Sequence, residues 1–555
     1  MTDWQQAERF LATTHQVENQ PPALENYNLF TQDVALQEAL KREGAEWAKA
    51  SVHVMGELAG RAETIRLGFQ ANANKPQFEP QDRFGHRVDY VDYHDAYHQL
   101  MTLATEHGLH ASPWADPKAG AHVARAAKYY LHTQVEAAHG CPITMTFAAV
   151  PALQHQPDLA QYWIPKILHN SYDPRNVPDT EKQAVTIGMA MTEKQGGSDV
   201  RANTTRAYPV AKEGPGQVYE LVGHKWFVSA PMCDAFLVLA QTKAGLSCFL
   251  LPRWRPDGSK NPLQILRLKD KMGNVANASS EAELRGAMAW MVGEEGRGVR
   301  TIIEMVAMTR YDCMIGSAAG MRQATVQALH HCQHRAAFGA RLIDQPLMQN
   351  VLADLAIESE AAMTLTMRMA RAMDSQQDEH ERMLARIAVA AGKYWICKRT
   401  PEHAYEAMEV IGGSGVMENC IMPRLYREAP INAIWEGSGN VQCLDVLRAV
   451  QKQPECFAAL MTEVKRAAGS HKQLDAAIAA LPKRLEQAQE QPFFARQLVE
   501  LIARTLQGAL LQQHAPNEVA DAFCNSRLGA NEHLGYGRLT DAATAKQILS
   551  RAWPK

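Results

Sequence analysis

Apolar residues recur at every third or fourth position through much of the first third of the chain. Ala124, Ala127 and Leu131 show this spacing, which places their side chains on one face of an α-helix. Pro142 interrupts the pattern and predicts either a helix start or a buried turn. We therefore expect an N-terminal helical domain, with an N-terminal extension, over residues 1–184.

The pattern changes near Ala184 to short runs of apolar and β-branched residues. Such runs begin at Val185, Val218 and Ala235, with Gly and Pro residues between them. Their short spacing predicts an antiparallel β domain, a sandwich or a barrel, over residues 185–290. The connecting segments are too short for helical crossovers between parallel strands, so a doubly wound nucleotide-binding fold is disfavoured.

The helical spacing then returns and continues to the C-terminus. Residues 291–450 are predicted to form a helical bundle. An extra helical domain is predicted over residues 451–555, where Leu498, Ile502 and Leu506 repeat at i, i+4 and i+8. The fold class expected from these patterns is α+β, predominantly α.

The composition is that of an ordinary globular protein. Of 555 residues, 46% are hydrophobic and 21% are charged, and the formal net charge is −3. These values exclude intrinsic disorder, collagen and coiled coil, and they give no global basic character that would indicate a nucleic-acid partner. The cysteines form no C-x-x-C pair, which argues against a zinc ribbon or a disulfide framework. Neither a long apolar run nor a signal peptide is found, so we expect no membrane partner and a cytoplasmic location.

Two glycine-containing segments could carry chemistry. The segment 190–202 follows a predicted strand, and its backbone N–H groups and hydroxyls could bind a polar ring edge or a phosphate. The alternative is an ordinary hairpin turn. In the segment 434–440, Glu436 lies between Trp435 and a Gly-Ser-Gly turn, where desolvation would raise the pKa of its carboxyl and make it a useful base. The alternative here is a glycine loop with an exposed glutamate.

Arg335 and Phe338 are three residues apart, which would place them on one helix face, with Gly339 ending the helix. A helix end with a solvated arginine is the alternative. His330 and His334 have a spacing that suits a metal, but no further ligand lies nearby in sequence, so we expect no metal site.

The predicted C-terminal domain has a small excess of basic residues. They could contact phosphates, although such an excess alone is usually a solvated face. The basic residues considered are Lys465, Arg466, Lys483, Arg484, Arg496 and Arg504.

In their order and spacing, these segments resemble the acyl-CoA dehydrogenase family. Residues 190–199 match its first signature, which ends in E-x-x-G-G-S-D. The second signature runs from an acidic residue through G-G-x-G and begins here at Glu409, and the run Arg335-x-x-Phe338-Gly339 is a third match.

Several strings are similar to the AidB branch of that family, the bacterial alkylation-response flavoproteins. These strings begin at Cys141, Met191, Leu221 and Trp435. Members of the branch are homotetramers, dimers of dimers, that contain FAD and have feeble acyl-CoA dehydrogenase activity. They bind double-stranded DNA through an added helical domain, which residues 451–555 would supply. The resemblance therefore implies FAD, double-stranded DNA and acyl-CoA as ligands.

The resemblance also implies which residues contact FAD. Phe227 stands where the wider family has Trp, in a W-I-T string. Arg335 would reach the FAD pyrophosphate of a neighbouring subunit, a charge-assisted contact. The implied cofactor-binding residues are Met191, Thr192, Gly197, Ser198, Phe227, Val228, Ser229, Arg335, Trp435, Gly437, Ser438 and Asn440.

The family places its catalytic glutamate either in the glycine loop or in a Glu-Arg pair on an upstream helix. The upstream pair here is Thr309-Arg310, which has no carboxylate, so the resemblance assigns the base to Glu436. Its backbone N–H and a flavin ribityl hydroxyl would stabilise the enolate of an acyl-CoA. Arg448 follows on the next helix, where it could anchor an anionic ligand, pair with Glu436, or be a surface residue.

Two functions of different class follow. In the first, the protein is an FAD-containing protein of the response to DNA alkylation, which binds DNA and shields it or destroys the alkylating agent. In the second, it is a metabolic acyl-CoA dehydrogenase that passes electrons to an electron-transfer flavoprotein. A binding scaffold with a purely structural FAD is a third possibility. The C-terminal residues and the branch-specific strings favour the first function.

Overall fold

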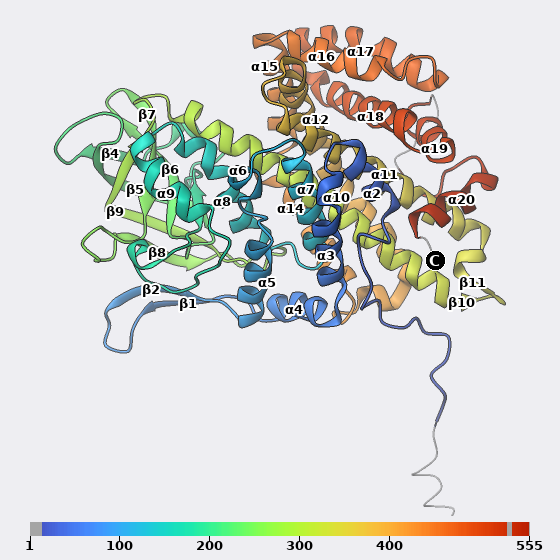
Figure 1. Cartoon of the computed structure of the whole chain (residues 1–555), viewed down its shortest axis with the longest axis horizontal. Coiled ribbons are helices and arrows are strands. Elements are labelled where there is room, and N and C mark those ends of the chain that lie inside the picture. Colours follow the sequence, from blue (N-terminus) through green and yellow to red (C-terminus); the bar gives the residue numbers. More distant parts are fainter. Residues whose placement is uncertain (1–13, 530–534, 554–555) are drawn as a thin grey trace, which may run out of the picture.

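The computed structural model describes residues 14–529 and 535–553. In Figure 1 the strands of the middle region lie at one end of a larger helical body, and C-terminal helices run along its upper edge. This arrangement matches the predicted fold class, a mainly helical protein with a central β domain.

The N-terminal region is helical, as predicted. Pro142 lies in the first turn of a helix, so the expected helix start is confirmed. A two-stranded hairpin, β1 (Gln77–Gln81) and β2 (Arg87–Asp92), interrupts the helices and was not predicted. The helices are α2 (Val34–Arg42), α3 (Lys49–Gly60), α4 (Ala62–Ala73), α5 (Asp95–Glu106), α6 (Ser112–Ala115), α7 (Ala121–Thr133), α8 (Gly140–Leu153) and α9 (Pro157–Ile167).

The β domain is a seven-stranded sheet in the order β3-β6-β4-β5-β9-β7, with β8 paired to β9. Pairing of β6 with β7 closes the path into a barrel. The expectation of a purely antiparallel sheet is wrong, because β6 is parallel to both β3 and β4. The intervening β4–β5 hairpin lets these strands enter in the same direction without a helical crossover. The strands are β3 (Ile187–Ala190), β4 (Arg206–Pro209), β5 (Val218–Ser229), β6 (Ala235–Thr242), β7 (Gly245–Pro252), β8 (Leu263–Leu268) and β9 (Ser279–Val292).

Two short strands, β10 (Ala336–Ala337) and β11 (Ala340–Arg341), follow the first helix of the bundle. Phe338 and Gly339 form the turn between them, and both have positive φ angles, 53° and 81°. The expectation that Arg335 and Phe338 share a helix face is therefore wrong. The helix ends at His334, and two consecutive residues in the left-handed region form a tight hairpin turn.

The bundle and the C-terminal helices share one hydrophobic core. Leu498 and Ile502 lie in the same buried cluster as Leu365 and Leu384. The bundle comprises α10 (Gly298–His334), α11 (Pro346–Asp374), α12 (Glu379–Ile411), α13 (Met422–Glu428), α14 (Ile431–Ile434) and α15 (Gly439–Lys452). The C-terminal helices are α16 (Glu455–Lys465), α17 (Lys472–Glu490), α18 (Ala495–His514), α19 (Asn517–Arg527) and α20 (Ala542–Ala552).

In the described ranges, no helix has the length and apolarity needed to cross a membrane. His330 and His334 use ring nitrogens in hydrogen bonds to the backbone oxygens of Pro22 and His330. Within the same ranges, no group of three or more histidine, cysteine, aspartate or glutamate side chains is placed to hold a metal ion.

Candidate active site

The loop between α14 and α15 holds Glu436 in an unusual backbone conformation. Its φ angle is +57°, in the left-handed region that a residue with a β carbon rarely adopts. Lys393 Nζ on α12 donates hydrogen bonds to the carbonyls of Trp435 (2.7 Å) and Gly437 (2.6 Å). Arg310 Nε donates to the Glu436 carbonyl at 2.9 Å. Buried donors on two helices therefore fix the backbone on both sides of the carboxylate.

The Glu436 side chain is held from the upstream helix. Thr309 Oγ1 on α10 donates to Glu436 Oε2 at 2.7 Å. Burial raises the pKa of Glu436, while the Thr309 hydrogen bond and the charges of Lys393 and Arg310 act in the opposite direction. The net result is a carboxyl with a raised pKa, as a general base requires. The Thr309-Arg310 pair, which lacks a carboxylate, thus positions the glutamate.

Arg310 is in turn held by a cluster of charged side chains. Its Nη1 donates to Asp445 Oδ2 at 2.9 Å, and Arg386 donates to both oxygens of the same carboxylate at 2.9 and 3.0 Å. Burial would raise the pKa of Asp445, but the two arginines outweigh this effect and lower it. Sequence reasoning missed this cluster, because its members lie on three helices.

Arg448 is exposed on α15. It lies nine residues beyond the start of that helix, about 13 Å along its axis. Across the part of the chain that the structure describes, the hydrogen-bonding partners of Glu436 do not include it. A role for Arg448 at the base therefore stays a prediction.

The first signature forms the loop after β3. Trp226 N donates to the Thr192 carbonyl at 2.8 Å, and Asn203 Nδ2 donates to the Met191 carbonyl at 2.9 Å. A β carbon at Gly197 would lie 2.5 Å from Thr192 Oγ1, so the loop can fold back only with glycine there. Ser198 is exposed next to this close approach.

Glu193 anchors this loop, a role that the sequence did not reveal. Its side chain is fully buried, and its Oε1 accepts from Lys225 Nζ at 3.0 Å. Its Oε2 accepts from the backbone N–H of Thr204 at 2.6 Å. Burial would raise the pKa of Glu193, but Lys225 and the hydrogen bonds lower it to about 2. The signature glutamate therefore ties the loop to β5 as a permanent anion.

The end of β5 presents alternate side chains to the site. Val228 is fully buried in the barrel core, whereas Phe227 is 44% exposed. Ser229 Oγ lies 3.1 Å from Ser279 Oγ on β9. Burial raises the pKa of the Cys141 thiol on α8 to about 11, and the nearby Glu436 carboxylate adds to the rise while Lys271 and Ser229 oppose it. The β domain, α8 and the Glu436 loop therefore meet around Cys141.

The start of α15 lies beside the C-terminal helices. Ser438 is the residue before the helix, and its side chain makes no hydrogen bond to the first turn. Asn440 Oδ1 accepts from Arg496 Nε on α18 at 2.8 Å. The first-turn N–H groups are therefore left for an anionic group, as helix N-termini favour.

Arg335 lies apart from the other predicted residues. In Figure 1 its hairpin, β10–β11, is at the opposite end of the molecule from the β barrel. Arg335 Nη1 donates to the Asn19 carbonyl at 2.7 Å, and Phe338 at the hairpin tip is fully exposed. Within one chain, the structure does not bring Arg335 to Glu436.

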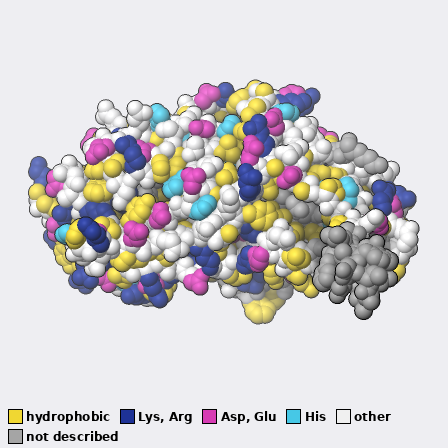
Figure 2. All heavy atoms as spheres, turned by 90° about the horizontal axis from the view of Figure 1, so that it is seen from below, with side chains coloured by type: hydrophobic (Ala, Val, Ile, Leu, Met, Phe, Trp, Pro, Cys, Tyr) yellow, Lys and Arg dark blue, Asp and Glu magenta, His cyan; other side chains and the backbone are white. Residues whose placement is uncertain are grey.

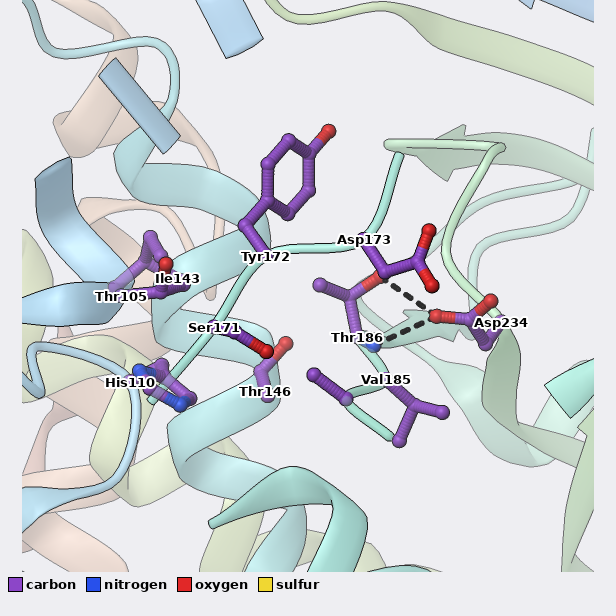
Figure 3. A pocket seen from close by; sticks show the side chains of 11 residues that line it. Thr105, His110, Ile143, Thr146, Ser171, Tyr172, Asp173, Val185, Thr186 and Asp234 are labelled. Atoms are coloured by element: carbon purple, nitrogen blue, oxygen red, sulfur yellow. Dashed lines mark hydrogen bonds between the residues drawn. The ribbon is translucent and has the colours of Figure 1, made fainter. Parts of the chain in front are cut away.

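Two cavities lie outside this region. Figure 3 shows the first, between the N-terminal helices and β3, where Asp234 accepts a hydrogen bond from Thr186 N and burial lowers the pKa of His110 to about 4. Its volume of about 10 Å³ suits a single water molecule. The second, about 270 Å³, lies between α19 and α20 and is lined by Glu518, Asp521 and Asp541. Neither cavity includes a predicted site residue.

The loop after β3 and the end of β5 suit a planar, polar-edged cofactor. They offer held backbone groups at Met191 and Thr192, a hydroxyl at Ser229 and a half-exposed aromatic ring at Phe227. The uncapped start of α15 suits a phosphate-bearing part. This donor set fits a flavin nucleotide.

Models of known families match most of the chain. The model of the adaptive response protein AidB N-terminal domain matches residues 19–174. The acyl-CoA dehydrogenase middle domain matches residues 188–287, and the acyl-CoA dehydrogenase C-terminal domain matches residues 296–451. AidB of Escherichia coli (strain K12) is 45% identical over 517 residues, which cover 93% of this chain and 94% of that protein.

Solved structures agree with these matches. Caenorhabditis elegans ACDH-11, in complex with C11-CoA, has a TM-score of 0.82 and 28% identity, and the match covers 98% of this chain and 93% of that one. An acyl-CoA dehydrogenase from Bacillus anthracis, complexed with FAD, shares the fold at a TM-score of 0.66 and 17% identity, over 96% of this chain and 89% of that one.

Proposed function

The chain belongs to the AidB branch of the acyl-CoA dehydrogenase family, and we propose that it uses Glu436 to remove the α-proton of an acyl-CoA. It is an FAD-dependent oxidoreductase. The observation that carries the proposal is the Glu436 carboxyl, which has a raised pKa and is fixed by Thr309 from α10. The C11-CoA of the nematode relative supports an acyl-CoA ligand.

FAD, Glu436 and the donors around its loop would each have a separate role in the proposed reaction. Bound FAD supplies the hydride acceptor for the β-hydrogen. Glu436 accepts the α-proton on its carboxylate, while Thr309 holds Oε2 and leaves Oε1 directed elsewhere. The Glu436 N–H is a donor for the thioester oxygen, and the hydrogen bonds from Lys393 and Arg310 fix the peptide groups around it.

An anaerobic titration of the holoprotein with saturated acyl-CoAs of increasing chain length tests this proposal. We expect the flavin absorbance to bleach slowly, with a preference for one range of chain length. A flavin that no acyl-CoA bleaches would contradict acyl-CoA chemistry at this site.

Replacing Thr309 by Val is expected to shift the pH dependence of flavin reduction. The Thr309 hydrogen bond lowers the pKa of Glu436, so its loss raises that pKa. Because the base acts only when deprotonated, the acid limb of the profile should move to higher pH. Reduction rates measured across pH check this, with Thr309→Ser as the control that retains the hydroxyl. An unmoved acid limb in Thr309→Val would contradict the assignment of the base.

We propose further that the protein acts in the response to DNA alkylation. It would bind double-stranded DNA through the C-terminal helices and protect it from alkylating agents, or inactivate them. The similarity to E. coli AidB supports this proposal. Exposed basic residues on α17 and α18 and at the end of α16 would contact phosphates, namely Lys465, Arg466, Lys483, Arg484 and Arg496.

Two observations refine the DNA-binding proposal. Arg504 is buried and donates to the Arg527 carbonyl at 2.8 Å, so it does not offer a surface charge. Figure 2 shows the molecule from below, opposite to α16, α17 and α18 at the top of Figure 1, and acidic and basic side chains are interspersed over its coloured part. That face offers no single-sign surface for a phosphate backbone, so the DNA-binding face is proposed on the C-terminal helices.

Reversing the charges of Lys483 and Arg484 together, Lys483→Glu with Arg484→Glu, is expected to weaken duplex DNA binding about tenfold and to lower its salt dependence by roughly one to two ions. Both residues are exposed on α17. The matched control is Arg206→Glu with Lys212→Glu, an equal charge change at exposed positions of the β domain. Fluorescence anisotropy with a labelled duplex at several salt concentrations measures both. Equal losses in the two double variants would place the DNA contact elsewhere.

The proposed assembly is a homotetramer in which Arg335 reaches the FAD of a neighbouring subunit. The fully exposed Phe338 and the largely exposed Leu347 beside this hairpin support a contact with another copy. Light scattering of the holoprotein gives the molar mass that tests it. The metabolic alternative predicts fast turnover with an electron-transfer flavoprotein as the acceptor.

A further inference from the structure

A chain of hydrogen-bonding side chains runs from a lysine to the proposed flavin site. Lys271 Nζ, in the loop between β8 and β9, donates to Ser279 Oγ at 2.9 Å. Ser279 Oγ lies 3.1 Å from Ser229 Oγ, at a position where β5 and β9 pair. Lys271 Nζ also donates to the Asn277 carbonyl at 2.8 Å, which fixes the ammonium against this loop.

The lysine favours one direction of the hydrogen bond between the two serines. An ammonium group can only donate, so Ser279 Oγ must accept from Lys271. The single hydroxyl hydrogen of Ser279 can then point to Ser229 Oγ, which accepts it and keeps its own hydrogen for another partner. Each such bond also polarises the next, which strengthens the last donor. The distance alone allows either serine to be the donor, and the ammonium favours Ser279 because the hydroxyl hydrogen of Ser279 then points away from the positive charge.

The middle of this hydrogen-bonded series is buried away from bulk water. Ser279 is only 3% exposed, while Lys271 and Ser229 are partly exposed at its two ends. Burial lowers the pKa of Lys271, and nearby Cys141, Glu428 and Glu136 act in the opposite direction. The other end, Ser229, lies two residues from Phe227 and near Cys141, where the proposed site begins.

We infer that Lys271 is a positioning residue for the cofactor: through Ser279 it holds Ser229 as a hydrogen-bond donor toward the flavin ring. This inference rests on the proposed placement of Ser229 against the flavin. A donor at the ring favours binding of the cofactor, and it contacts the oxidised and the reduced ring differently. Loss of this donor should therefore weaken FAD binding and change the midpoint potential of the bound flavin.

The test uses the full-length protein, stripped of FAD and then reloaded. We expect Lys271→Met to weaken FAD binding about five- to tenfold, as the loss of one charge-assisted hydrogen bond would. The midpoint potential of the bound flavin should differ from that of the parent protein. Lys271→Arg, which still only donates, should restore both properties. Lys243→Met is the charge-loss control, because Lys243 forms an exposed ion pair with Glu213 in the same domain.

A double-mutant cycle separates this pathway from a general effect of charge. If Lys271 acts through Ser279, its replacement should add little to Ser279→Ala, so the two losses should not be additive. Additive losses, or a Lys271→Met protein that behaves like Lys243→Met, would overturn the inference. A Ser229→Ala protein with unchanged FAD affinity and spectrum would instead overturn the placement of Ser229 at the flavin. The Ser279→Ala variant removes a single oxygen, so it keeps the test informative if Lys271→Met folds poorly.

Discussion

Replacing Glu436 by Gln should slow the bleaching of the flavin by acyl-CoA by a factor of about 10² to 10⁴, the range typical of a lost general base. The amide keeps the size of the side chain and can still accept the Thr309 hydrogen bond, so the loop should retain its shape. It cannot take up the α-proton. Stopped-flow absorbance under anaerobic conditions measures the rate directly.

The matched control for this change is Glu409→Gln, the same substitution at an exposed glutamate on α12. It should bleach at the parent rate. The Glu436→Gln protein should also retain FAD and its binding of duplex DNA, because in the described structure the hydrogen-bonding partners of Glu436 are Thr309, Arg310 and Gln442, on neither the barrel loops nor α17. Bleaching at the parent rate in Glu436→Gln would show that another group removes the proton.

The sequence located the motif residues but not the residues that hold them. The strings around Thr192, Ser229 and Glu436 are each continuous, so short-range reading finds them. Their supports come from far along the chain: Lys393 is 43 residues before Glu436, and Lys225 is 32 residues after Glu193. A single sequence carries no signal of such pairing.

The errors in the fold have similar causes. The helical spacing that predicted α10 gave no sign that the helix stops before Arg335, because Ala336 and Ala337 are good helix formers. The helix ends here because Phe338 and Gly339 adopt positive φ angles and form a tight turn. The parallel pairing of β3 with β6 depends on strands that are separated by a whole hairpin, so their direction could not be deduced from either strand.

The C-terminal helices were predicted to form an added domain, but in the part of the chain that the structure describes they do not have a core of their own. The continued helical spacing and the resemblance to the AidB branch predicted an added domain over residues 451–555, yet its helices share a core with α11 and α12. Deleting them to test DNA binding would expose that core, and a loss of binding would then have two explanations. Surface charge reversal on α17 is therefore the cleaner test of the DNA-binding proposal.

A buried cluster of charged side chains also joins the C-terminal helix α19 to the bundle helix α11. Arg527 is fully buried, and its guanidinium bonds to Asp354 and, at 2.8 Å, to Glu358. We expect Asp354→Leu to destabilise the protein by about 3 to 5 kcal/mol, because Glu358 would then be left to balance the buried guanidinium groups of both Arg527 and Arg399, and one buried positive charge would be uncompensated. Denaturant unfolding followed by tryptophan fluorescence measures this loss.

The same replacement combined with Arg527→Met should recover much of the stability, because no buried charge then lacks its partner and Glu358 still lies 3.4 Å from Arg399. Glu418→Ala is the control for an exposed pair with Arg427, and it should cost less than about 1 kcal/mol. If the double variant were as unstable as Asp354→Leu, an uncompensated charge would not be the cause.

The Asp354→Leu replacement should also affect FAD binding, since Arg496 on the same group of helices contacts Asn440 beside the Glu436 loop. A loosened α19 is therefore expected to weaken FAD retention along with the fold.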